Sequence, residues 1–359
     1  MSGSLGHRAA SPWRLVAAFI LVLTTILQTS RAGAEERPRI AIIATGGTIA
    51  NTAEGRIPIE TVLEDIRRDF PKSRSLLDSV EFEVTDILRV ASHQFGSEDF
   101  LKIAKAAEAA LADSEVDAVI VTQGSYVAEE TAYLLNLLVR SAKPLIVVCA
   151  QRPHRSISND GDQNLLDAIR VALSPEAAGK GAMLVTNQTI NSGREVVKTS
   201  SRPDAFSSGI YGVLGLVEQD GSVSFYRQPT RRHTQETEFD LQTIDTMPKV
   251  DVVSSYYDAD PALIQALHEQ GVKGIVVEGY TMTGDPHPGQ ESALNALIAE
   301  GIPVVLTARG GTSNRIPANA ENQYIEGDNL VWYKARILLQ LALTKTNDPA
   351  EIQRIFLEY

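Results

Sequence analysis

The sequence predicts a two-domain α/β fold in which parallel-rich sheets are flanked by helices. Short apolar runs rich in β-branched residues indicate buried strands, at Ile40–Ala44, Ala118–Thr122, Leu145–Cys149, Ala182–Val185, Val250–Val253, Gly274–Val277 and Val304–Leu306. Segments with helical periodicity occupy 99–112, 129–140, 164–173, 261–270, 291–300, 334–343 and 349–356. Because strands and helices alternate, we expect largely parallel sheets with helices on both faces.

One polar stretch without clear periodicity, Arg227–Lys249, divides these elements into two groups. It contains Pro229 and Pro248, and such composition is typical of a linker. We therefore expect a larger N-terminal domain over 35–226 and a smaller C-terminal domain over 250–359.

The first 34 residues have the features of a secretory signal peptide. Arg8 and Arg14 precede an apolar run, 15–27, and a small-residue triplet, 32–34, follows it. An uncleaved membrane anchor is the alternative, but the run is shorter than the ~20 apolar residues of a spanning helix. The sequence thus predicts a periplasmic or secreted protein that has no membrane association after cleavage.

Charge and cysteine content exclude several functions. Residues 1–34 hold three of the 33 basic residues and no acidic one, so the remainder carries 30 basic and 45 acidic side chains, a net charge of −15. Nucleic acid is excluded as a partner because phosphate binding needs clustered Lys and Arg. Cys149 is the single cysteine and ends an apolar run, which favours a buried structural thiol over a nucleophile. The six histidines show no ligand-like pairing, so neither a metal nor another cofactor is expected.

The first polar loop follows the strand that begins the N-terminal domain. Residues 44–50 read ATGGTIA. The adjacent glycines, Gly46 and Gly47, allow a sharp turn that places Thr48 in the crevice where α/β sheets bind ligands. The spacing matches neither common nucleotide-binding pattern. A Thr48 that only caps a turn is the structural alternative.

Two further polar loops follow the next strands, at 121–133 (VTQGSYVAEETAY) and 150–161. The first contains Ser125, whose hydroxyl is a candidate catalytic group. The alternative is an N-cap for a helix that starts near Val127.

These segments resemble the bacterial type II L-asparaginase and glutaminase-asparaginase family. The family's first signature is present letter for letter at 44–50, and the second, THGTDT followed by xEETAY, is recognisable but altered. Further matches follow in order along the rest of the chain: Arg152-Pro153, Asp160-Gly161, Asn164-Leu165, Gly193-Arg194, Val196, Lys198-Thr199, Lys334-Ala335-Arg336 and Leu343-Thr344. The resemblance implies an asparaginase-like fold throughout the mature chain.

The resemblance also implies a mechanism and an assembly. In the family a threonine hydroxyl attacks a side-chain amide, ammonia leaves, and water releases the acid. By resemblance Thr48 is the nucleophile, and Ser125, Lys198 and Tyr126 occupy the positions of a supporting triad. The substrate, a small amino-acid amide, would be bound by Ser92, His93, Gly47 and Gly124, with backbone N–H groups of the glycine turns holding the oxyanion. Family members are homotetramers built as dimers of dimers.

Four departures from the family pattern leave two functional hypotheses open. Tyr126 replaces an aspartate that binds the substrate's α-ammonium, His93 replaces a glutamine, and Gln123 replaces a histidine. The lid segment, 51–58, is short and lacks the family's tyrosine. One hypothesis is an amidohydrolase, either a slow asparaginase or one with a shifted substrate; the other is a non-catalytic protein that binds a small molecule.

Overall fold

The computed structural model describes residues 1–3, 37–310, 315–316 and 323–359. Most of the predicted signal peptide lies outside these ranges. Residues Arg39–Tyr359 form one compact unit that contains the helices and strands described below. Within the described ranges, no helix has the length and apolar character needed to cross a membrane.

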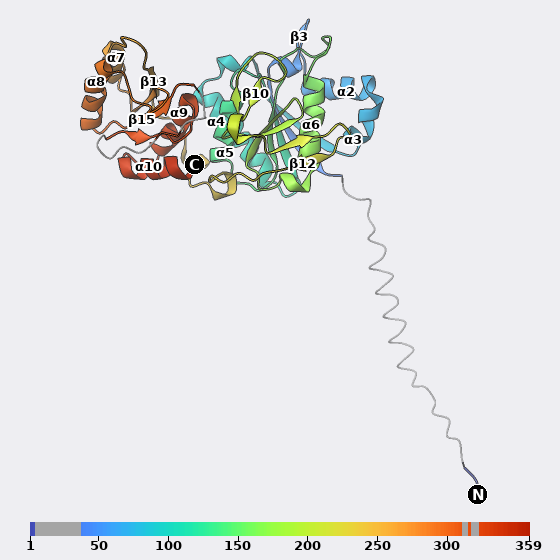
Figure 1. Cartoon of the computed structure of the whole chain (residues 1–359). Coiled ribbons are helices and arrows are strands. Elements are labelled where there is room, and N and C mark those ends of the chain that lie inside the picture. Colours follow the sequence, from blue (N-terminus) through green and yellow to red (C-terminus); the bar gives the residue numbers. More distant parts are fainter. Residues whose placement is uncertain (4–36, 311–314, 317–322) are drawn as a thin grey trace. The chain divides into compact units, whose positions relative to one another are not determined.

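The larger sheet belongs to the N-terminal domain and has eight strands in the order β12-β11-β8-β7-β6-β5-β1-β4 (Figure 1). Along the chain they are β1 (Arg39–Gly46), β4 (Glu81–Val90), β5 (Ala118–Thr122), β6 (Leu145–Val148), β7 (Ala182–Thr186), β8 (Thr189–Ser192), β11 (Gly215–Val217) and β12 (Val223–Phe225). Neighbouring strands from β4 to β7 run parallel, and those from β7 to β12 run antiparallel. The sheet is therefore mixed. Four of the five strands in its parallel half, β1, β5, β6 and β7, were predicted from the sequence.

Alternate residues of the central strands face two separate hydrophobic cores, as the period of a strand requires. In β1, Ile40 and Ile42 join the core that also holds α2 (Ile59–Asp69) and α6 (Gly161–Leu173). Ala41 and Ile43 join the other core, with α4 (Ser97–Ala112) and α5 (Ala128–Leu138). Burial on both faces explains why these strands are continuous apolar runs in the sequence.

The smaller sheet belongs to the C-terminal domain and is fully parallel. Its order is β13-β14-β15-β16, with β13 at Val250–Ser254, β14 at Gly274–Gly279, β15 at Val304–Ala308 and β16 at Ile325–Glu326. One face packs on α7 (Ala262–Glu269) and α8 (Pro288–Ala299). The other face packs on α9 (Trp332–Ala342) and α10 (Pro349–Glu358), and this core is continuous with that of α4 and α5.

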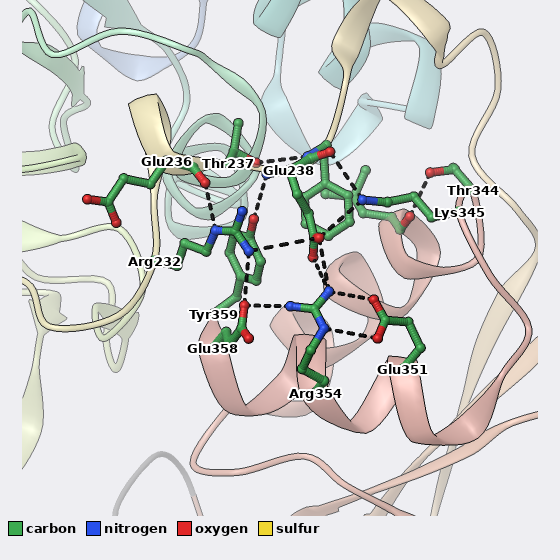
Figure 2. Close-up of polar contacts among 12 residues, drawn as sticks. Arg232, Glu236, Thr237, Glu238, Thr344, Lys345, Glu351, Arg354, Glu358 and Tyr359 are labelled. Carbon is green, nitrogen blue, oxygen red and sulfur yellow. Dashed lines mark hydrogen bonds and ion pairs between the residues drawn. The ribbon is translucent and has the colours of Figure 1, made fainter.

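The segment predicted as a linker, 227–249, is packed against the rest of the chain. It contains two 3₁₀ helices, η6 (Thr234–Glu236) and η7 (Leu241–Thr243), and the Phe239 side chain is fully buried. Figure 2 shows its ionic contacts with the C-terminal end of the chain: Glu238 pairs with Arg354 and Lys345, and Arg232 pairs with Glu358. Within α10, Arg354 also pairs with Glu351 and Glu358. The domain boundaries assigned from sequence remain a prediction.

The predicted strands and helices are present, with ends that differ by three residues or fewer. Sequence analysis missed α2, α3 (Arg74–Asp78), the ten-residue β4 and the short strands β8, β11, β12 and β16. Shorter strands complete the fold: β2 (Asn51–Thr52), β3 (Gly55–Arg56), β9 (Val197–Lys198) and β10 (Phe206–Ser207). The remaining 3₁₀ helices are η1 (Thr48–Ala50), η2 (Pro71–Ser73), η3 (Ser92–Gln94), η4 (Pro175–Ala177) and η5 (Gly209–Tyr211).

Candidate active site

The turn after β1 requires glycine at two successive positions. Gly46 and Gly47 have φ values of 92° and 80°, which side-chain-bearing residues rarely adopt. A Cβ on Gly47 would lie 2.1 Å from the backbone nitrogen of Gly124, so the two loops touch through their backbones. The half-buried Thr48 follows at once, as the first residue of η1.

The Gly47 N–H group is already engaged, because it donates a hydrogen bond to the carbonyl of Val90 at 3.2 Å. The role expected of this N–H in holding an oxyanion would require that bond to open. In this structure Gly47 serves the site through its backbone conformation and its close approach to Gly124.

The loop after β5 packs against the predicted substrate-binding serine. A Cβ on Gly124 would lie 2.6 Å from Ser92 Oγ, and the Tyr126 N–H donates to the same oxygen at 3.1 Å. Ser92 is 1% exposed and Ser125 is 5% exposed. The structure thus brings Ser92, Gly124 and Ser125 together with Gly47, and Thr48 and Ser125 each follow one of the two touching glycines.

Lys198 reaches this cluster from β9, which pairs with β10. Its Nζ donates to Ser125 Oγ at 2.8 Å, and Ser125 Oγ donates to Gln151 Oε1 at 3.2 Å. Partial burial lowers the pKa of Lys198, although the charges of Cys149 and Glu129 oppose this shift. A lysine that loses its proton more readily can accept one from the hydroxyl it contacts.

The start of α5 and the hydrogen bonds of Ser125 exclude the alternative that Ser125 caps this helix. Helix α5 begins at Ala128, its N-cap residue is Val127, and no side chain caps it. Ser125 is therefore not an N-cap, and its hydroxyl is used between Lys198 and Gln151.

Tyr126 and His93 lie at the exposed rim of the cluster. Their rings meet edge to face, with centroids 5.1 Å apart and an interplanar angle of 82°. Lys198 Nζ lies 5.2 Å from the centroid of the Tyr126 ring, which is a cation–π contact. Tyr126 thus contacts the lysine through its ring, and a phenol supplies no carboxylate to a substrate ammonium.

Gln151 is a site residue that sequence analysis did not identify. Asp160 accepts hydrogen bonds from the N–H groups of Gln151 and Arg152, at 2.9 and 2.8 Å, and so fixes the start of this loop. Asn164 donates to the carbonyl of Cys149 at 2.9 Å. The polar run 150–161 was the available signal, but the sequence did not show which member would reach Ser125.

The lid segment, Cys149 and possible metal ligands complete the description of the site. The lid segment forms the β2–β3 hairpin, whose exposed tip is closed by a hydrogen bond from Thr52 Oγ1 to the carbonyl of Gly55 at 2.9 Å. Cys149 is fully buried, and burial raises the pKa of its thiol. Across the described residues, no group of three or more His, Cys, Asp or Glu side chains could hold a metal ion.

Comparisons with known proteins identify the family. Residues 39–231 match the model of the asparaginase N-terminal domain, and residues 249–356 match that of the glutaminase/asparaginase C-terminal domain. The chain is 38% identical to L-asparaginase 2 of Bacillus subtilis, over 92% of this chain and 90% of the relative. It is 35% identical to a glutaminase-asparaginase of Pseudomonas fluorescens biotype A, over 89% of this chain and 90% of the relative.

A solved structure agrees with these matches. The probable cytoplasmic L-asparaginase of Campylobacter jejuni superposes with a TM-score of 0.83 at 38% identity, covering 90% of this chain and all of that one. The fold predicted from sequence is confirmed in both sheets. Sequence motifs, topology and relatives agree, and the chain belongs to the asparaginase family.

Proposed function

We propose that the chain is an amidohydrolase that converts L-asparagine, or L-glutamine or a related amide, into the acid and ammonia. The observation that supports this most is the hydrogen bond from Lys198 to Ser125 beside the glycine turn that carries Thr48. It pairs a partly desolvated amine with a buried hydroxyl, next to a second hydroxyl that can act as a nucleophile. The relatives named above agree with this reaction class.

In this proposal Thr48 Oγ attacks the carbonyl carbon of the side-chain amide. The threonine proton passes, through Ser125 and Lys198, to the nitrogen of the leaving group, so that ammonia departs and an ester to Thr48 remains. Water then adds to the ester carbonyl, releases the carboxylic acid and returns a proton to Thr48. In the same proposal Gly124, Ser92 and His93, which gather around Tyr126, bind the amino-acid end of the substrate.

A second candidate function is small-molecule binding without turnover, and Tyr126 is the observation that favours it. Its exposed ring contacts Lys198 where the family has a carboxylate. Loss of that carboxylate weakens both the triad and the binding of an α-ammonium.

Assembly and location form part of the same proposal. We propose a homotetramer built as a dimer of dimers, acting in the periplasm or outside the cell after cleavage near Glu35. Light scattering of the mature protein should report about four times the subunit mass, and a concentration-independent monomer would contradict the assembly.

Ammonia release by the purified mature protein tests the central proposal. Asparagine, glutamine and a panel of simple amides should be compared at millimolar concentration. Ammonia release from any of these compounds by the wild type, together with its loss in Thr48→Ala, would support hydrolysis. Saturable calorimetric binding of an amide with no ammonia from any compound would instead support the binding function.

A further inference from the structure

The strand that carries Lys198 lies outside both main sheets. β9 contains two residues and pairs with the equally short β10 in a separate two-stranded sheet. A further backbone bond is just as local, since the Thr199 N–H donates to the carbonyl of Ala205 at 2.7 Å. Ser125, by contrast, follows β5 in the interior of the eight-stranded sheet. The position of Lys198 beside Ser125 therefore depends on the segments that flank this short ribbon.

A buried lysine of the C-terminal domain holds the segment on one side. The turn 193–196 joins β8 to β9. Lys334 Nζ donates to three carbonyl oxygens of this turn, at 2.9 Å to each of the first two, and the acceptors are Gly193, Arg194 and Val196. Lys334 is in the first turn of α9 and is fully buried. A protonated lysine amine has three N–H donors, and each of them has a backbone acceptor here.

The Arg194 side chain anchors the same turn a second time. Its guanidinium donates to Asn329 at 2.7 Å and to Asp328 at 3.0 Å, both in the loop that precedes α9. Those bonds hold a side chain, whereas Lys334 binds the backbone as far as Val196, which directly precedes β9. Of the two anchors, Lys334 thus acts on the part of the turn that leads into the strand.

We propose that Lys334 is a positioning residue that holds β9 at the place from which Lys198 reaches Ser125. The inference rests on the proposed role of Lys198 in amide hydrolysis. Lys198 follows the last of the three carbonyl groups by two residues, and its Nζ donates to Ser125 Oγ at 2.8 Å. A displacement of about 1 Å at a catalytic group can lower turnover about 100-fold. Loosening the turn should therefore slow proton transfer although every catalytic group is still present.

The first test compares kcat and KM for any amide that the wild type hydrolyses. Lys334→Met occupies similar space without a donor, and it should lower kcat by about 10- to 100-fold while KM changes little. Equal kcat values for wild type and folded Lys334→Met would overturn the proposal.

Arg336→Met is the matched control on the same helix. Arg336 follows Lys334 by two residues in α9, but its Nε donates to the carbonyl of Val250 at 2.8 Å. Its loss disturbs the packing of α9 on β13 without releasing the turn 193–196. The kcat of Arg336→Met should therefore stay within about twofold of wild type. A loss as large as that of Lys334→Met would show that any disturbance of α9 lowers turnover, and would overturn the specific role of Lys334.

A double variant separates positioning from general destabilisation. Since Lys334 is proposed to act only through Lys198, Lys334→Met should cause little further loss of kcat when Lys198→Met is already present. The rates are compared at equal folded fractions, which circular dichroism measures. A further loss as large as that seen in the wild-type background would show that Lys334 acts on turnover by another route, and would overturn the positioning role.

Lys334→Gln keeps the test decisive if Lys334→Met fails to fold because three carbonyl groups lack a donor. A glutamine amide has two N–H donors and ends one bond closer to the backbone, so it cannot hold all three carbonyl groups. Lys334→Gln should lower kcat about tenfold, again only where Lys198 is present. An unchanged kcat in folded Lys334→Gln would overturn the proposal.

A measurement without turnover distinguishes failure of this inference from failure of the proposed function. Trace acetic anhydride labels neutral amines, and peptide mass spectrometry gives the pH midpoint of labelling at Lys198. Partial burial lowers the pKa of Lys198, so release of β9 should move this midpoint to higher pH in Lys334→Met and leave it in place in Arg336→Met. Equal midpoints in Lys334→Met and wild type would overturn the positioning role. A moved midpoint in a protein whose wild type releases no ammonia would reject the proposed function and still support the placement of Lys198 by Lys334.

Discussion

The loop that follows β6 belongs to two polar clusters that differ in their charge balance. Near its start, Gln151 contacts Ser125, which in turn accepts a hydrogen bond from Lys198. Lys198 forms no ion pair with the described residues. Farther along, the His154 cluster, defined as Asp65, His154, Arg155 and Asp162, is closed by direct charge pairs.

The His154 cluster joins three elements. His154 Nδ1 donates to Asp162 at the start of α6 at 2.7 Å, and its Nε2 donates to Asp65 of α2 at 3.0 Å. Arg155 Nε donates to the same Asp65 oxygen at 2.7 Å. With each ring nitrogen on a carboxylate, His154 is held as an imidazolium, and the cluster has no unpaired group to offer a substrate. Completed pairing thus indicates a structural role, and incomplete pairing at Lys198 indicates a chemical one.

If the Lys198 side of this loop is the chemical one, the largest loss of turnover is expected from Thr48→Ala. Removing the proposed nucleophile should lower kcat for any hydrolysed amide by about three orders of magnitude or more. The denaturant midpoint should change little, because Thr48 is only half-buried and the substitution removes just its hydroxyl and one methyl group. Ammonia release at fixed enzyme concentration measures the loss. Turnover equal to wild type would place the nucleophile elsewhere.

Ser125→Ala and Lys198→Met should follow, each lowering kcat by about 10²- to 10³-fold. The two residues act as one hydrogen-bonded unit, so the double variant should be little worse than the worse single variant. Initial rates and KM should be measured for all three. Multiplicative losses in the double variant would show that the residues contribute separately.

The third effect concerns stability rather than turnover. His154→Gln removes the cation shared by Asp65 and Asp162 and should lower the free energy of unfolding by about 3 kcal/mol. Arg155→Gln is the matched control: the Arg155 side chain is 47% exposed, so its loss should cost about 1 kcal/mol or less. Urea unfolding measures both. A kcat for His154→Gln that falls as far as that of Lys198→Met would remove the distinction between the two clusters.

A pH dependence with a defined sign follows from the same histidine. Burial alone would lower the pKa of His154, but hydrogen bonds and charges from Asp162 and Asp65 outweigh it and raise the pKa above the ordinary 6.5. The stabilisation is therefore complete below about pH 6.5 and is lost as pH rises through the folded-state pKa. Between pH 6 and 9, urea midpoints of wild type should fall toward those of His154→Gln. A constant difference across this range would show that His154 does not titrate there.

The contrast between clusters also shows what the sequence could and could not predict. Strands such as β1 and β5 were predictable because burial on both faces makes them continuous apolar runs. Edge strand β4 contains only exposed and half-buried residues over its ten positions, so it lacks such a run. Thr48 and Ser125 were found through glycine turns and family motifs, whereas the role of Gln151 depends on a contact with Ser125 across the fold that no local spacing encodes.

The smallest of these effects, about an order of magnitude, concerns Tyr126. An α-ammonium that enters a partly dehydrated site without a carboxylate loses a charge-assisted hydrogen bond, typically worth about 1.5–3 kcal/mol. Each 1.4 kcal/mol is about tenfold in affinity, so asparagine should be captured about 10- to 100-fold less well than with an aspartate present. Tyr126→Asp should therefore raise kcat/KM for L-asparagine by about tenfold or more.

Substrates without the ammonium test the cause of that change. An amide whose α-amino group is blocked or absent should respond little to Tyr126→Asp. The Tyr126 ring is 63% exposed, so its removal leaves no enclosed void that would complicate the comparison. Tyr126→Phe is the matched control, because it keeps the ring that faces Lys198 and should leave both substrates nearly unchanged. Equal effects of Tyr126→Asp on both substrates, or a wild type already efficient on asparagine, would show that another carboxylate binds the amino group.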